Sequence, residues 1–351
     1  MLVRGEVDVH NLLDLDPSLE PIQGELASYL GRVVDRFDEA LQSDILAVQR
    51  LTQHVERYRG KMLRPALVAL SAGAAHGDLA AVLQGPKGAA LEIIGAVCEM
   101  VHMATLVHDD VLDEADTRRR GRTVNAMSGN ETAVILGDYL IAGAYHLCST
   151  LDEQSTALRV ARASMVVCSG ELLQLDRRDD LSLDEATYFE IIDRKTAELI
   201  AAACELGATA AGGSPEVVSS LEAFGRQIGA AFQVRDDLLD LTGREEVVGK
   251  SVGRDARKGK LTLPVIHHLA QAEPAERAHS LALALRAASE DSGDAPAELR
   301  RRIETTNSVQ HAQAASEAIV GRARERLDPL RDSPSRRTML AMADAVVNRS
   351  F

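Results

Sequence analysis

The sequence predicts an all-α protein. Apolar residues recur every three or four positions along most of the chain, alanine and leucine are abundant, and no segment alternates convincingly between apolar and polar residues. The chain has 351 residues, of which 46% are hydrophobic, and this is enough for one substantial core. No linker divides the chain, so we expect a single domain over residues 1–351.

The helices are expected in order along the chain, separated by clusters of glycine, proline and charged residues. Three starts carry capping signals: Ser182 with Glu185 matches a capping box, Ser214 precedes Pro215, and Asn130 precedes an acidic residue. The expected helices span 20–42, 44–58, 65–76, 87–113, 131–148, 155–176, 184–211, 216–242, 262–271, 275–289, 296–304, 308–328 and 335–349.

Composition limits the partners and the compartment. The 39 basic and 53 acidic residues give a net charge of −14, which argues against nucleic acid as a partner. The four cysteines, Cys98, Cys148, Cys168 and Cys204, lack CxxC spacing and lie in apolar runs, so we interpret them as buried thiols in a reducing compartment. The acidic N-terminus does not match a signal peptide, and no uninterrupted apolar stretch approaches about 18 residues. We expect a cytoplasmic protein.

An acidic cluster ends the apolar helical run within residues 92–125. Asp109, Asp110 and Asp113 are followed by Arg118 and Arg119. Residues four apart share a helix face, so the carboxylates of Asp109 and Asp113 project side by side and repel each other unless a cation lies between them. A site with only a few carboxylate ligands suits Mg²⁺. This ion keeps several of its waters and takes phosphate oxygens from a substrate as further ligands.

A second cluster repeats the first. The segment FQVRDDLLD at 232–240 places Asp236, Asp237 and Asp240 at the same spacing after another helical run. A single cluster of this kind is more often a solvated helix end. Two clusters far apart in the sequence predict that the fold brings their helices together and that Mg²⁺ ions clamp a diphosphate between them.

These motifs resemble the two aspartate-rich motifs of the trans-isoprenyl (polyprenyl) diphosphate synthases, and VHMATLVHDDVLDEAD is most similar to the medium- and long-chain members. The resemblance implies an isoprenoid synthase type I fold, which is a helical bundle around a central cavity, and a homodimer. Its motif-bearing core spans about 60–264. The further matches are GKMLRP at 60–65, GELLQLD at 170–176, Lys195-Thr196, Gly249-Lys250 and GKLTLP at 259–264.

The resemblance also implies a reaction. An allylic diphosphate ionises, and the double bond of isopentenyl diphosphate attacks the resulting cation, which lengthens the prenyl chain. The expected partners are isopentenyl diphosphate and dimethylallyl, geranyl or farnesyl diphosphate, with about three Mg²⁺ ions per active site and a peripheral membrane contact for product release. Catalysis then depends on preorganised cations around the departing diphosphate and on a dry cavity.

The residues that match the family's site fall into three sets. Direct Mg²⁺ ligands are Asp109, Asp113 and Asp236, with Asp110, Asp237 and Asp240 as outer or partial ligands. The allylic diphosphate is held by Arg118, Lys195, Thr196, Gln233, Lys250 and Lys260. The diphosphate of isopentenyl diphosphate is held by Lys61, Arg64, His102 and Arg119.

Helical phase distinguishes the two histidines of this segment. His102 precedes Asp109 by seven residues, about two turns, so it faces the same side as the acidic cluster. His108 has no such phase relation, and we interpret it as structural.

Three positions depart from the family's pattern. Arg59 stands in place of a glycine, Met62 in place of an arginine, and Arg120 in place of a glycine. Met62 removes one cation near the isopentenyl diphosphate site, whereas Arg59 and Arg120 add charge nearby. The substitutions leave the expected metal ligands intact, so they affect substrate details.

Product length is set in this family by residues four, five and eight positions before the first aspartate. Here those residues are Thr105, Ala104 and Val101, and none is a bulky aromatic that would form a floor. We therefore predict products of twenty carbons or more.

Three other classes of protein share parts of this pattern. HD-type metal phosphohydrolases have adjacent His and Asp, as at His108 and Asp109, but that class leaves the second cluster unexplained. A regulatory subunit of a heteromeric synthase would be expected to lose aspartates, and all six are present. Class I terpene cyclases and head-to-head synthases usually change the second motif and lack the GKxLRP segment.

Overall fold

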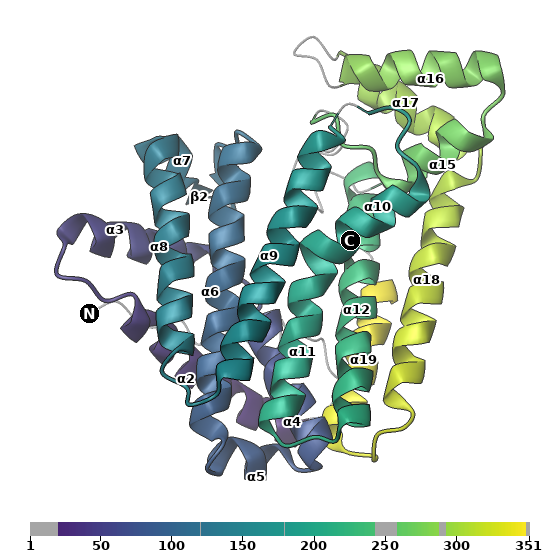
Figure 1. Ribbon diagram of the computed structural model, residues 1–351. Coiled ribbons are helices and arrows are strands. Elements are labelled where there is room, and N and C mark those ends of the chain that lie inside the picture. The colour runs from purple at the N-terminus through teal and green to yellow at the C-terminus, as the bar shows by residue number, and fades with distance from the viewer. Residues whose placement is uncertain (1–19, 120, 179, 243–257, 288–292, 349–351) are drawn as a thin grey trace. The chain divides into compact units, whose positions relative to one another are not determined.

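The structure is a computed structural model of the chain that describes residues 20–119, 121–178, 180–242, 258–287 and 293–348 (Figure 1). These residues are helical almost throughout, which confirms the all-α class. They form two compact units. Unit 1 is the described part of Met1–Ser164 with Leu199–Gly225 and Arg326–Met342, and unit 2 is that of Met165–Glu198, Arg226–Glu325 and Ala343–Phe351. A single domain over 1–351 stays a prediction.

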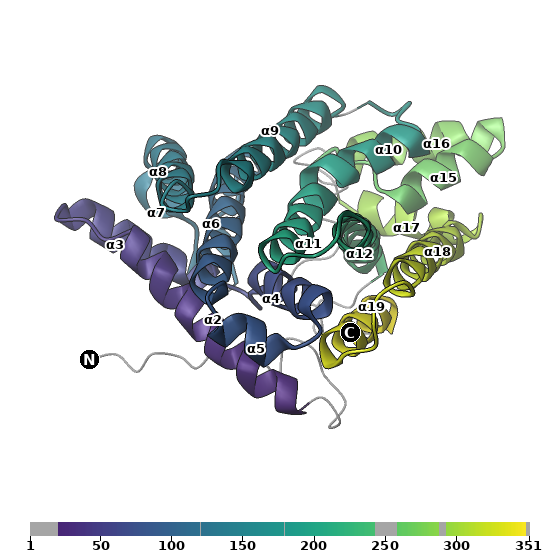
Figure 2. The ribbon, with the colours of Figure 1, turned by 60° about the horizontal axis from the view of Figure 1, so that its bottom comes forward.

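Unit 1 is built around helix α6 (Gly88–Leu112), which packs against α2, α4 and α8 (Figure 2). The helix is long and apolar enough to cross a membrane, but 72% of its most apolar stretch is buried inside the protein. Helix α6 is therefore buried in the way expected of a core helix. The neighbouring elements are α2 (Glu20–Ala40), α3 (Leu46–Val55), the 3₁₀ turn η2 (Glu56–Tyr58), α4 (Leu63–His76), α5 (Leu79–Gln84), α7 (Val124–Ser128) and α8 (Asn130–Cys148).

Glycines let the helices around α6 approach closely. A Cβ at Gly95 would lie 2.5 Å from the Tyr29 hydroxyl, and a Cβ at Gly143 of α8 would lie 2.8 Å from Met100 Cε. The buried Tyr29 hydroxyl donates a hydrogen bond of 2.8 Å to the carbonyl of Leu91. Since α6 is surrounded in this way, its position is fixed by packing on several sides.

Unit 2 contains a small apolar core of its own, which includes Leu269, Leu283 and Ile303. This core lies among α15 (Leu263–Gln271), α16 (Pro274–Ala287) and α17 (Ala295–Glu304). The remaining elements of the unit are α10 (Glu185–Ile192) and the π-helical turn η3 (Asp193–Ala197). Helices that contribute residues to both units are α9 (Gln154–Asp176), α11 (Glu198–Ala210), α12 (Pro215–Thr242), α18 (Ser308–Leu327) and α19 (Pro334–Asn348).

Most of the predicted helices are confirmed within a few residues, with three differences. The predicted helix 184–211 is divided by η3 into α10 and α11. The short helices α5 and α7 were not predicted, because one or two turns show too little periodicity. The expectation of no strand is wrong for β1 (Thr117–Arg118) and β2 (Gly121–Arg122), which pair antiparallel with Thr117 opposite Arg122.

The capping predictions were partly correct. Ser214 accepts a hydrogen bond from the N–H of Val217 at 3.4 Å, which confirms the predicted start of α12. The Ser182 prediction is wrong, because α10 is capped by Asp184, whose carboxylate accepts from the N–H of Thr187 at 2.8 Å. Asn130 is the first residue of α8 and follows Gly129, so it is not the N-cap.

The four cysteines have free thiols, and three of them are buried as predicted: Cys98, Cys148 and Cys204. The prediction is wrong for Cys168, which is exposed on α9. An apolar run alone does not reveal which face of a helix is covered, and α9 keeps apolar residues on an exposed face.

Two adjacent histidines of α15 are placed in apolar or crowded surroundings. His268 is fully buried, with Nδ1 2.9 Å from Thr306 Oγ1 and Nε2 2.8 Å from Ser280 Oγ. The ring of His267 stacks on that of His311 at a centroid distance of 3.9 Å. Burial lowers the pKa of both His267 and His268, so the folded protein disfavours their protonation.

The lowered pKa values of His267 and His268 predict loss of stability in mild acid. Below the ordinary histidine pKa of about 6.5, the unfolded chain binds protons that the folded protein does not. The stability that comes from keeping these rings neutral is therefore complete above that pH and decreases as pH falls toward the folded pKa values. Urea unfolding midpoints measured between about pH 7.5 and 5.5 should fall in the wild type.

A matched pair of variants assigns the effect. His268→Gln should flatten the pH dependence, whereas replacement of the exposed His279 by Gln should leave it unchanged. Identical slopes for the wild type and His268→Gln would contradict the assignment.

Candidate active site

Both acidic clusters lie at the carboxyl end of a long helix. Asp109 is in the last turn of α6, and Asp113 is its C-cap, whose N–H donates to the Asp109 carbonyl at 2.8 Å. Asp236 and Asp240 lie in the last two turns of α12. Neither helix has a basic residue in its last turn. Because a helix carries partial negative charge at its carboxyl end, these carboxylates lie where anions are disfavoured and a cation is attracted.

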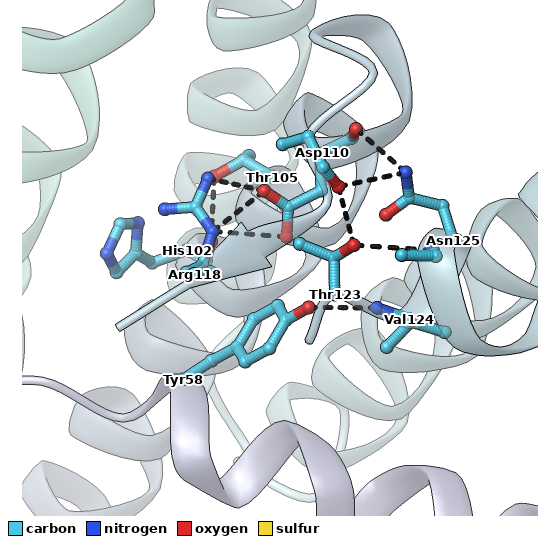
Figure 3. A network of polar contacts seen from close by, with 10 residues as sticks. Tyr58, His102, Thr105, Asp110, Arg118, Thr123, Val124 and Asn125 are labelled. Atoms are coloured by element: carbon cyan, nitrogen blue, oxygen red, sulfur yellow. Dashed lines mark hydrogen bonds and ion pairs between the residues drawn. The ribbon is translucent and has the colours of Figure 1, made fainter. Parts of the chain in front are cut away.

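The middle aspartate of the first cluster is buried and paired. Asp110 is 2% exposed. Arg118 Nε donates to both of its carboxylate oxygens at 2.9 and 3.1 Å, and a second guanidinium nitrogen lies 2.8 Å away (Figure 3). The Arg118 guanidinium also lies 5.9 Å from the centre of the Tyr58 ring. Asp110 therefore orients Arg118 in advance.

Backbone contacts hold the turn that follows α6. The Asn125 amide donates to the carbonyls of Asp110 and Ala115, both at 3.2 Å. The buried hydroxyl of Tyr58 accepts the N–H of Val124 at 3.1 Å (Figure 3). These contacts fix the segment between the first cluster and the arginines that follow it.

The middle aspartate of the second cluster is also buried. Asp237 is 7% exposed and accepts hydrogen bonds from Tyr188 Oη at 2.7 Å and Gln233 Nε2 at 2.8 Å. Gln233 Oε1 in turn accepts from the Thr196 hydroxyl at 2.9 Å. The structure thus brings together Thr196 and Gln233, and their predicted role in holding the allylic diphosphate stays a prediction. Sequence reasoning missed Tyr188, which lies seven residues before Lys195 on an apolar helix face.

Lys195 and Thr196 lie in the π-helical turn η3, an irregularity that is frequent at functional sites. Arg226 of α12 bridges both ends of the turn: its guanidinium lies 3.0 Å from Asp193 Oδ2 and 2.7 Å from Glu198 Oε2. Lys195 Nζ forms an ion pair with Glu171 of α9. The turn is therefore held against two helices, and its lysine is oriented before any substrate binds.

Gly170 of the GELLQLD motif explains how α9 approaches this turn. A Cβ at Gly170 would lie 2.7 Å from Arg194 Cβ and 2.7 Å from the backbone nitrogen of Lys195. Only glycine leaves room for that contact, so the motif's first residue has a packing role.

A basic cluster in unit 1, formed by Arg64, His102 and Arg119, contains most of the residues predicted to hold isopentenyl diphosphate. Burial lowers the pKa of His102, and the positive charges of Arg64 and Arg119 lower it further, so the imidazole is neutral at pH 7. Burial raises the pKa of Glu99, which lies on α6 and is 2% exposed, against the attraction of both arginines. Sequence reasoning missed Glu99, although a lone acid in an apolar helix is a signal.

Two buried atoms of this cluster lack a hydrogen-bond partner among the described residues. They are Arg64 Nε and Glu99 Oε2. Because an unpaired buried donor is costly, Arg64 Nε is suited to donate a hydrogen bond to a bound acceptor. An anionic diphosphate beside Arg64 would supply that acceptor.

The GKMLRP segment contacts the cluster through Gly60. The Arg119 guanidinium lies against Gly60, where a Cβ would overlap it. Met62, buried at 2% exposure, adopts a φ of 52° in the left-handed region just before α4. Lys61 is exposed beside this turn. The departure at Met62 is therefore an apolar residue placed in the core.

Arg59 is anchored to helix α2 beside this cluster. Arg59 forms an ion pair with Asp38 of α2, and its guanidinium lies 4.4 Å from the centre of the Phe37 ring. Its positive charge also lowers the pKa of Glu99, against the larger effect of burial. Two other predicted cations, Lys250 and Arg120, lie outside the described residues, and Lys260 is half-buried shortly before α15.

His108 belongs to the packing between α6 and α8. Its Nε2 lies 3.2 Å from the Val134 carbonyl and 3.6 Å from Asp138 Oδ1, and its ring occupies the space beside Gly137. This confirms the structural interpretation of His108.

The three residues expected to control product length differ in exposure. Thr105 is half-buried, and its hydroxyl donates to the His102 carbonyl at 2.7 Å. Ala104 and Val101 are 0% and 1% exposed, so they are packed in the core and present almost no surface. Their role in product length stays a prediction, with Thr105 the accessible one of the three.

The two acidic clusters lie in different units: Asp109 and Asp113 in unit 1, Asp236 and Asp240 in unit 2. Within the described ranges, no three His, Cys, Asp or Glu side chains form a group that could hold a metal ion. The prediction that both clusters bind metal around one diphosphate stays a prediction.

Comparison with known proteins gives concordant results. The family model described as polyprenyl synthetase matches residues 46–303. The chain is 33% identical to the octaprenyl diphosphate synthase of Escherichia coli over 335 residues, covering 95% of this chain and 99% of that protein. It is also 33% identical to a short chain isoprenyl diphosphate synthase of Methanothermobacter thermautotrophicus, covering 93% of this chain and 99% of that protein.

A solved structure is similar over the whole chain. It is the crystal structure of a polyprenyl synthase from Caulobacter crescentus complexed with calcium and isoprenyl diphosphate. The TM-score is 0.84 at 31% identity, with 99% of each chain covered. This likeness confirms the fold that the sequence motifs implied.

The contact at Gly170 predicts a specific defect. Gly170→Ala should force α9 and η3 apart, destabilise the protein by about 1–3 kcal/mol through overpacking, and displace Lys195. Gly321→Ala is the control, because a Cβ there has no neighbour within 4 Å and alanine favours the helix. Denaturant unfolding of both variants, with the KM for the allylic substrate, checks this. Equal stability of the two variants would show that Gly170 is not required for the contact.

Proposed function

The chain belongs to the polyprenyl synthetase family, and we propose that it is a chain-elongating prenyltransferase. It condenses isopentenyl diphosphate with an allylic diphosphate to give a product of twenty carbons or more. The observation that carries this proposal is the arrangement of the two acidic clusters. In each, the middle aspartate is buried and hydrogen-bonded, while the outer two lie at a helix carboxyl end with exposed or half-exposed carboxylates.

The outer aspartates Asp109, Asp113, Asp236 and Asp240 have the chemistry of Mg²⁺ ligands. They offer hard oxygen donors at helix ends that attract cations. Bound Mg²⁺ would stabilise the negative charge that develops on the departing diphosphate. The calcium and isoprenyl diphosphate in the Caulobacter crescentus structure support a divalent cation in this family.

The chain's own cations act on the same charge. Arg118 and Lys195 are each held by a carboxylate, from Asp110 and Glu171, before substrate arrives. Donors that are already oriented need little reorganisation when the allylic diphosphate ionises, which is the main source of electrostatic catalysis. Thr196, next to Lys195 and bonded to Gln233, fixes the local geometry of this site.

The basic cluster around Arg64 and Arg119 suits the diphosphate of isopentenyl diphosphate. A neutral His102 adds a hydrogen-bond donor without repelling the two guanidinium groups. Since isopentenyl diphosphate keeps its diphosphate during the reaction, charge-assisted hydrogen bonds are sufficient there.

The exposed face of α9 supports a homodimer. Leu158, Met165 and Leu172 recur every seven residues and are 62%, 73% and 67% exposed, and Ile135 of α8 is 67% exposed. Residues at this spacing form one apolar stripe. A second copy that presents the same stripe would cover it in a symmetric dimer.

Free buried thiols accord with a cytoplasmic location.

The metal proposal predicts a large loss of turnover in Asp109→Asn. The substitution keeps size but removes charge from the carboxyl end of α6, and should lower kcat by about two orders of magnitude or more. The exposed Asp152, replaced by Asn, is the control and should leave kcat unchanged. Incorporation of labelled isopentenyl diphosphate with Mg²⁺, and with excess chelator, measures both effects. Full activity in chelator would rule out the metal mechanism.

Product length is tested at Thr105, which has accessible surface on the face of Asp109. Thr105→Phe should shorten the product, because the ring would occupy the path of the growing chain. Thr105→Val, which has nearly the same volume, should leave product length unchanged. Chromatographic sizing of the dephosphorylated products decides it. A wild-type product of fifteen carbons, or no change in an active Phe variant, would contradict the prediction.

A further inference from the structure

A chain of three hydrogen bonds runs from a buried tyrosine to the η3 turn. Tyr188 Oη lies 2.7 Å from Asp237 Oδ2, Gln233 Nε2 lies 2.8 Å from Asp237 Oδ1, and Thr196 Oγ1 lies 2.9 Å from Gln233 Oε1. All four residues belong to unit 2. Tyr188 is 4% exposed and Asp237 is 7% exposed, so the far end of the chain is closed to solvent.

The chemistry of these groups sets the direction of every bond. An ionised carboxylate only accepts, so Tyr188 and Gln233 must both donate to Asp237. Once the Gln233 amide donates through Nε2, its Oε1 remains as an acceptor. Thr196 must then donate its hydroxyl proton to Gln233. The direction of the Thr196 hydroxyl is therefore determined by the Asp237 carboxylate, and Tyr188 orients that carboxylate through its other oxygen.

The position of Tyr188 gives this chain a mechanical role as well. Tyr188 lies in the middle of α10, the helix that immediately precedes η3. Its hydroxyl group forms a hydrogen bond that joins α10 to α12. Arg226 ties the ends of η3 to the same helix farther from its carboxyl end. Asp237 and Arg226, both on α12, thus fix the position of the turn that contains Lys195 and Thr196.

We propose that Tyr188 is a positioning residue for prenyl transfer, whose buried hydroxyl orients Asp237 and, through Gln233, the Thr196 hydroxyl beside Lys195. This assignment rests on the proposed function, because it concerns the site of the allylic diphosphate. Its effect should therefore be specific to that substrate. The basic cluster of unit 1, which includes Arg64, should be unaffected.

The test compares two buried tyrosine hydroxyls. Tyr188→Phe should raise the KM for the allylic diphosphate roughly tenfold, the scale of one hydrogen bond to a charged acceptor, and leave the KM for isopentenyl diphosphate unchanged. Tyr29→Phe is the matched control, because it removes an equally buried hydroxyl that donates to a backbone carbonyl in unit 1. It should lower Tm without changing either KM.

A double-mutant cycle shows whether Tyr188 acts through Thr196. If it does, the variant with both Tyr188→Phe and Thr196→Val has about the same allylic KM as Thr196→Val alone. Effects that multiply in the double variant would overturn the assignment. An unchanged allylic KM in a folded Tyr188→Phe protein, or equal changes in both KM values, would overturn it too.

A second variant keeps the test informative if Tyr188→Phe does not fold. Asp237→Asn retains an acceptor for Tyr188 but turns a donor toward Gln233, so the amide must reverse and Thr196 must accept. The allylic KM should rise while the isopentenyl diphosphate KM stays constant, and an unchanged allylic KM would overturn the assignment. A wild-type chain that elongates no allylic diphosphate would overturn the proposed function and the assignment with it, whereas an active wild type with unaffected variants overturns only the assignment.

Discussion

The accumulation of negative charge at the carboxyl ends of α6 and α12 is the constraint on which the site depends. Each helix places three aspartates in or beside its last two turns and no basic residue in the last turn. A carboxylate in the last turn of a helix is disfavoured by roughly 0.3–1 kcal/mol. A fold that keeps this arrangement must either satisfy the carboxylates internally or bind cations. Asp110 and Asp237 accept hydrogen bonds from internal donors, and the outer aspartates are the proposed cation ligands.

The division of labour within each cluster follows from burial. Asp110 and Asp237 cannot remain charged in the interior without donors, and each has them: Arg118 for the first, Tyr188 and Gln233 for the second. The outer aspartates are exposed or half-buried, and they are the proposed metal ligands. The buried aspartate of each cluster therefore orients a neighbouring side chain, which is Arg118 for Asp110 and Gln233 for Asp237.

The same reasoning applies to the cations of the site. A π-helical turn is less regular than the α-helices around it, and here it is held by Arg226, by the pair between Lys195 and Glu171, and by the close approach at Gly170. In unit 1, burial keeps His102 neutral among arginines and raises the pKa of Glu99 beside the same arginines. Both groups of cations are thus held in place by the protein itself, which suits the proposed electrostatic catalysis.

Much of this protein follows from its sequence alone. Helical periodicity was sufficient for the all-α class and most helix ranges, because helices of three turns or more repeat their apolar face several times. The spacing of Asp109 and Asp113, repeated at Asp236 and Asp240, identified the acidic clusters, because residues four apart share a face.

Tertiary structure alone decided the features that depend on contacts between distant segments. No local pattern shows that Tyr188 reaches Asp237, that Glu99 lies among arginines, that Gly170 makes room for Lys195, or that Cys168 faces outward. A sequence pattern reports which residues share a helix face. The packing of the helices decides which neighbouring segment covers that face and which hydrogen-bond donors it brings to the polar side chains there.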